Sequence, residues 1–111
     1  MEEHPRTKEE YVQRVLAAYR STPGTMGTIR RPDRFLAGQL YERGVPLMVI
    51  ENALVLAAAR RLTRGVESPP LNTIRSLAYF VPVIEEVRSL RVSPDFFQYL
   101  RQKIARHAPA R

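Results

Sequence analysis

The chain has 111 residues, no cysteine and a formal net charge of +7. This length suits a single domain, and the lack of cysteine excludes disulfides, thiolate metal sites and cysteine nucleophiles. A basic balance favours a polyanionic partner, and most of the excess positive charge lies in residues 11–64 and is carried by arginine.

The first residues, 1–6, are polar and begin with two acids, unlike the basic and then apolar start of a signal peptide. We expect them to form a disordered leader. The apolar run 53–59 is far shorter than the roughly 20 residues that cross a bilayer. These features predict a cytoplasmic protein without a membrane partner.

The first two helices have clear start signals. Thr7 and Glu10 form the pattern of a capping box, and apolar residues at helical spacing follow, which predicts a helix over 8–20. After a loop with Pro23-Gly24, Pro32 suits the first position of a helix over 32–43.

The next helix is expected over 46–63. Its residues are apolar on nearly all sides, which is typical of a buried helix. It is therefore predicted to be the central helix of the fold, or else to serve a subunit interface as well.

Two further helices are expected after the loop at 65–72. Asn72 can cap the first of them, and Pro82 must kink or restart it. Ser93-Pro94 predicts the start of the last helix, which should end near Arg106. No segment alternates with period two. The predicted fold is all-α, a compact bundle of about five helices without a sheet, in one domain over 7–106 with a flexible tail at 107–111.

The strongest candidate site is the start of helix 32–43, where Arg30, Arg31 and Arg34 crowd the positive end of the helix dipole. For stability alone these charges are unfavourably placed. A phosphate bound by the arginines and by free amides would explain them. The alternative is that they pair with acids such as Asp33 and Glu42, or remain in water.

Two weaker candidates complete the predicted nucleic-acid-binding set. Arg60, Arg61 and Arg64 lie at a helix C-terminus, where cations also favour the dipole without any ligand. Lys103 and Arg106 share a face with Tyr99, an arrangement that can track a backbone and stack a base. The alternative there is an ordinary solvated face.

Other functions find less support. Residues 36–50 have some character of a helix-turn-helix, but the second helix is too apolar to read a groove, so a plain helical hairpin is favoured. The two histidines, His4 and His107, lie in expected tails, and no catalytic motif occurs. We therefore predict a non-enzymatic protein with no cofactor and no metal ligands.

Residues 33–88 resemble the DnaD-type helical domain of bacterial and phage replication-initiation and primosome proteins. The resemblance rests on a helical pair joined by Gly44-Val45-Pro46, followed by a loop and an aromatic helix in which Phe80 and Ile84 keep the family spacing. Arg88 stands where the family has tryptophan. The resemblance implies DNA binding, self-association and a role in replication or mobile-element maintenance.

Together these features predict a module that binds nucleic acid through phosphates, DNA rather than RNA. The alternative is an accessory protein, or a small helical subunit of a larger ribonucleoprotein, that acts through protein contacts. A homodimer or a partner protein would then use helix 46–63 and the aromatic pairs Tyr79-Phe80 and Phe96-Phe97.

Overall fold

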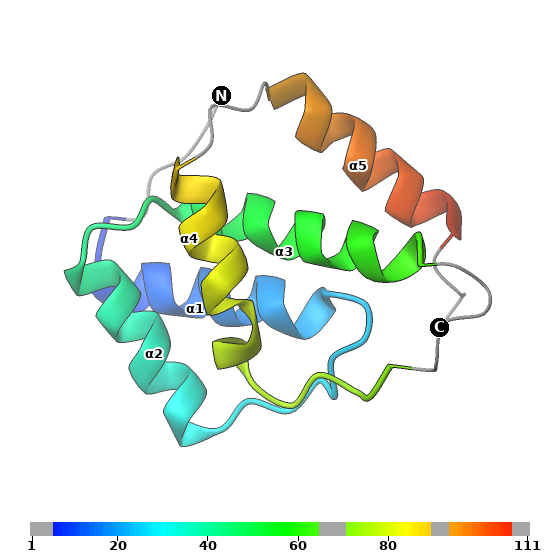
Figure 1. Ribbon diagram of the computed structural model, residues 1–111. Coiled ribbons are helices and arrows are strands. Elements are labelled where there is room, and N and C mark those ends of the chain that lie inside the picture. The colour runs from blue at the N-terminus through cyan, green and yellow to red at the C-terminus, as the bar shows by residue number, and fades with distance from the viewer. Residues whose placement is uncertain (1–5, 65–70, 90–93, 108–111) are drawn as a thin grey trace.

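The computed structural model describes residues 6–64, 71–89 and 94–107, and within these ranges the chain is helical with no strand. The elements in order are α1 (Lys8–Ser21), α2 (Arg31–Glu42), α3 (Leu47–Leu62), the 3-10 helix η1 (Leu77–Phe80), α4 (Val81–Ser89) and α5 (Pro94–His107). The expected all-α class and bundle of about five helices are confirmed (Figure 1).

Helix α3 is the central element, as its all-round apolar sequence predicts. It packs against α1, α4, α5 and η1, and Figure 1 shows it crossing the middle of the molecule. Ile50, Ala53 and Leu54 are almost fully buried. Each large side chain that is removed from water in this way contributes about 1.5–3 kcal/mol to folding. Because α3 is enclosed by its neighbours, it presents no polar face that could enter a DNA groove.

The start of α1 confirms the predicted cap with one difference. The amide of Glu10 donates to the Thr7 hydroxyl at 3.0 Å, as expected of a capping threonine. The Glu10 carboxylate, however, accepts from the amide of Arg6 at 2.9 Å rather than from that of Thr7. The cap therefore extends one residue further towards the N-terminus.

The segment before η1 corrects a prediction. Asn72 does not cap a helix, because residues 71–76 are extended and Ile74 pairs with Thr25 in an isolated parallel bridge. The Ile74 amide donates to the Gly24 carbonyl at 2.7 Å and its carbonyl accepts from Met26 at 3.0 Å. These bonds satisfy the backbone of the segment and bury the Ile74 side chain, so the extended form replaces the first helical turn.

The chain passes from a 3-10 helix to an α-helix just before Pro82, where the sequence predicts that the helix kinks or restarts. η1 ends at Phe80 and α4 begins at Val81, which places Pro82 in the first turn of α4, where its missing N–H costs nothing.

Three of the predicted features lie wholly or partly outside the described residues. Ser93, the predicted cap of the last helix, is one of these, as are residues 1–5 of the expected leader and 108–111 of the expected tail. His107 is the last residue of α5. No helix in the described ranges has both the length and the apolar character that spanning a bilayer requires.

Candidate nucleic-acid interface

The loop after α1 and the extended segment 71–76 lie together beside the start of α2. The Arg61 guanidinium at the end of α3 reaches Gly24 in this loop, whereas the chain runs on through residues 25–30 before α2 begins, and the Asp33–Leu77 bond holds the start of α2 beside η1. The Gly24–Met26 loop pairs with Ile74 there, and Figure 1 shows the two segments side by side. We call the start of α2 and the segments beside it the arginine end, and its basic residues are Arg20, Arg30, Arg31, Arg34 and Arg75.

Asp33 determines the local geometry of the arginine end. It is 2% exposed, and its two carboxylate oxygens accept from the amides of Arg30 and Leu77, each at 2.9 Å. One carboxylate thus joins the start of α2 to the start of η1. As a result, Arg75, two residues before Leu77, is held close to Arg30 and Arg31.

The amides at the start of α2 are largely occupied. Pro32 has no N–H, and the amides of Asp33 and Arg34 both donate to the carbonyl of Arg30. The Asp33 carboxylate also places a negative charge at the positive end of the helix dipole. An anion at this end would therefore be bound by guanidinium groups more than by the free amides that the sequence suggested.

Several arginines of this end have no acidic partner. Within the described part of the chain, the side chains of Arg20, Arg31, Arg34 and Arg75 make no hydrogen bond or ion pair. Arg30 reaches only the Met26 sulfur, at 3.9 Å. All five are exposed. Like charges gathered without acids raise the free energy of the folded protein, and an anionic ligand would relieve this.

The predicted arginines at the end of α3 make contacts within the fold. Arg60 makes two hydrogen bonds to the Glu86 carboxylate, one of them 2.8 Å long. This contact lowers the pKa of Glu86 and raises that of Arg60. Arg61 donates to the Asn72 carbonyl at 3.1 Å and to the Tyr79 hydroxyl at 3.3 Å. Arg64 is exposed, but it too has an interaction within the molecule.

The predicted residues of α5 lie apart from the start of α2. α5 packs on α3 and makes no substantial contact with α2, and Figure 1 shows the two helices on opposite sides of α3. Arg106 is exposed and Lys103 is half-buried and already engaged within the molecule. The predicted residues at the start of α2 and those of α5 therefore do not form one continuous surface.

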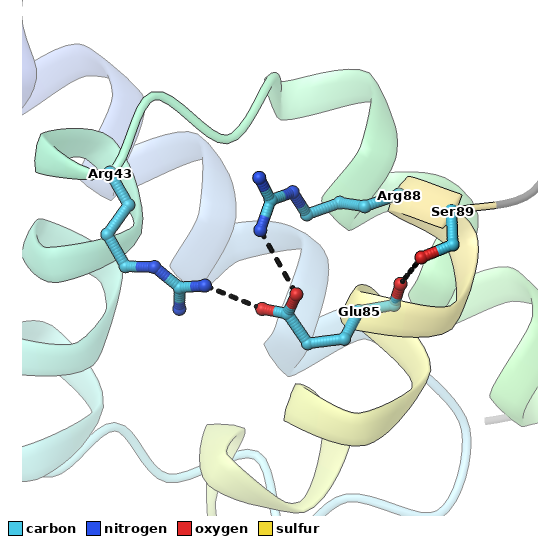
Figure 2. A network of polar contacts seen from close by, with 4 residues as sticks. All are labelled: Arg43, Glu85, Arg88 and Ser89. Atoms are coloured by element: carbon cyan, nitrogen blue, oxygen red, sulfur yellow. Dashed lines mark hydrogen bonds and ion pairs between the residues drawn. The ribbon is translucent and has the colours of Figure 1, made fainter.

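A contrasting region, which we call the paired region, surrounds the start of α1, the end of α2 and α4. The Glu85 carboxylate binds Arg43 at 2.8 Å and Arg88 at 3.0 Å, as Figure 2 shows. The hydrogen bond from Arg43 is the main reason that the pKa of Glu85 is lowered. In the same region, Lys8 and Glu42 form an ion pair at 2.8 Å.

Sequence reasoning missed two residues of the arginine end. Arg75 lies far from Arg30 in the sequence, and the Asp33–Leu77 bond, with the pairing of Ile74 and the 24–26 loop, brings the two segments together. Phe35 is 68% exposed, and it follows Arg31 by one helical turn. A signal for Phe35 existed, because a residue two places before the buried Ala37 points about 200° away from it.

One cavity between helices offers no catalytic arrangement among its lining residues. It has a volume of about 620 Å³ and lies between the end of α1, α3 and α5. The hydroxyls of Ser21 and Thr22 in its wall donate to backbone carbonyls of α1, and Arg101 bonds Asn52 at 2.8 Å. In the described ranges, no group of three or more histidine or acidic residues could hold a metal ion.

Comparison of the chain with protein-family models, curated proteins and solved structures finds no match.

Proposed function

We propose that this protein is a non-enzymatic helical module that binds nucleic acid through phosphate contacts at the arginine end. The observation that carries the proposal is the set of exposed arginines without acidic partners in the described chain, at the start of α2 and beside it. Guanidinium groups bind phosphate oxygens in a bidentate manner, and such groups supply much of the affinity of nucleic-acid-binding proteins.

Within this proposal, Arg30, Arg31 and Arg34 are the primary phosphate contacts, and Arg75 and Arg20 extend the surface. Arg60 and Arg61 serve mainly to hold α3 to α4 and to the 71–76 segment. Lys103 and Arg106 would contact a longer strand that passes over α5. DNA rather than RNA, and a role in replication or mobile-element maintenance, are what the resemblance to DnaD-type domains implies, and the cysteine-free composition favours the cytoplasm.

A salt titration tests the proposal. Fluorescence anisotropy with labelled oligonucleotides should show binding at low salt, and the logarithm of the affinity should fall linearly with the logarithm of the salt concentration. Three to five phosphate contacts predict a slope of about −2 to −5. A flat response, or no binding at low salt, would contradict the proposal.

The alternative is an accessory protein that acts through protein contacts. The aromatic pairs support it less than their sequence suggests, because Phe80 and Phe97 are buried in the core. The exposed aromatic residues Tyr79 on η1 and Phe96 and Tyr99 on α5, 47%, 42% and 54% exposed, are available to a partner or a second copy. Light scattering that finds a dimer, together with indifference to nucleic acid, would favour this function.

A further inference from the structure

Phe35 is the most exposed of the large apolar side chains in the described ranges, at 68%. A single exposed aromatic residue is common on protein surfaces and alone indicates nothing. Its position is what matters here. Arg31 precedes it by four residues and so shares its face of α2, and Arg34 is its immediate neighbour.

A second exposed ring lies on η1, the short helix that packs against α2. Tyr79, on η1, is 47% exposed, and the Arg61 guanidinium lies over its ring at 5.9 Å from the centroid. η1 packs against α2, and the Asp33–Leu77 hydrogen bond joins the starts of the two helices. Each exposed ring thus has an arginine beside it, and Arg75 lies in the segment that leads into η1.

This combination distinguishes between forms of nucleic acid. In an intact duplex the faces of the bases are stacked on one another, so a ring on a protein surface meets only phosphates, sugars and base edges. In a single strand the base faces are open, and aromatic side chains among cationic groups bind them by stacking. A ring at a duplex-binding surface would remain exposed to water or contact only a base edge.

Building on the proposed function, we infer that the arginine end takes a single-stranded nucleic acid. One base stacks on Phe35 and another on Tyr79, while Arg31, Arg34 and Arg75 bind the phosphates near them. Stacking is tolerant of base identity, because every base has a flat face, so the site accepts many sequences.

The test compares a labelled oligo-dT single strand with a duplex of the same length, for the wild-type chain and for Phe35→Ala. The wild type should bind the single strand more tightly. Phe35→Ala should weaken binding of the single strand roughly 5- to 100-fold, the range measured for loss of one stacking residue, and should change duplex affinity less than about twofold. Phe35→Trp should retain the affinity for the single strand.

Phe96→Ala is the matched control, since it also removes an exposed aromatic ring but on α5. It should leave both affinities unchanged. Equal binding of duplex and single strand, or an equal loss of both in Phe35→Ala, would overturn the inference while leaving the proposed function intact. Absence of binding to either at low salt would overturn both.

Discussion

The arginine end and the paired region use the same residue type in opposite ways. In the paired region Arg43 and Arg88 share the Glu85 carboxylate (Figure 2), and Lys8 reaches Glu42. At the arginine end, Arg31 and Arg34 have no such partner in the described chain. The net charge of +7 is therefore not spread evenly, and a count of basic residues alone would not locate it.

The acidic residue of the arginine end, Asp33, binds backbone amides and not arginine side chains. Asp33 is the acidic residue nearest to Arg30, Arg31 and Arg34 in the sequence, but both of its oxygens are bound to backbone amides. It stabilises the backbone that carries the arginines rather than neutralising their side chains. The following predictions test this division, from the largest effect on stability to the smallest.

Asp33→Ala should have the largest effect on stability. The substitution removes two charge-assisted hydrogen bonds from a buried position and leaves two amides without their acceptor. We expect a loss of about 3 kcal/mol in the free energy of unfolding, measured in urea. A loss below about 1 kcal/mol would show that Asp33 is not the link between α2 and η1.

Tyr11→Phe should cost about 1 kcal/mol at neutral pH. The Tyr11 hydroxyl donates to the Val45 carbonyl at 2.7 Å in the core, where it ties α1 to the turn between α2 and α3. Urea unfolding measures this loss, and a variant as stable as the wild type would contradict it.

The same tyrosine gives a prediction in alkaline solution. Burial raises the pKa of Tyr11 to about 12, against 10.0 for an ordinary tyrosine. Between pH 10 and 12 the folded state therefore holds more protons than the unfolded state, so stability falls as the pH rises. Tyr11→Phe should lose less stability over this window than the wild type, as thermal unfolding at several pH values would show.

Tyr19→Phe should be neutral or stabilising by up to about 1 kcal/mol. The Tyr19 hydroxyl is fully buried and has no hydrogen-bond partner in the described chain, so its removal relieves a desolvation penalty. Burial and then the Asp33 carboxylate raise the pKa of Tyr19, while Arg30 lowers it. A loss above about 1 kcal/mol in urea would show that the hydroxyl has a partner, such as a bound water.

Glu86→Gln should have the smallest effect. Its ion pair with Arg60 is exposed, and exposed pairs contribute little because water screens both charges. The shift of the urea midpoint should be smaller than that of Tyr11→Phe. Because the pKa of Glu86 is lowered in the folded protein, any contribution of this pair should disappear as the pH falls below the ordinary glutamate value of 4.5. A shift as large as that of Asp33→Ala would contradict this view of the pair.

Local signals in the sequence predict most of the helical fold. The capping threonine, Pro32 and the apolar surface of α3 each act within a few residues of their position. The helix boundaries observed for these elements lie within one residue of those expected. The failure at Asn72 has a non-local cause, since residues 71–76 pair with a loop almost fifty residues earlier.

The candidate site could be predicted only in part for the same reason. The cluster of Arg30, Arg31 and Arg34 is contiguous in the sequence and is visible there. The roles of Arg60 and Arg75 depend on which distant segment lies beside each, Glu86 in one case and the start of α2 in the other. Charge patterns alone do not contain that information.

The central claim is that the arginines at the start of α2 bind phosphate while those of the paired region do not. It is tested most directly by two variants with the same change in net charge, R30Q/R31Q/R34Q and K8Q/R43Q/R88Q, in a salt titration of oligo-dT binding. The first should lose most of the affinity and reduce the salt slope by up to about three, roughly one for each lost phosphate contact, while the second should stay near the wild type. Equal losses in the two variants would contradict the claim, because the binding would then depend on net charge and not on the arginine end.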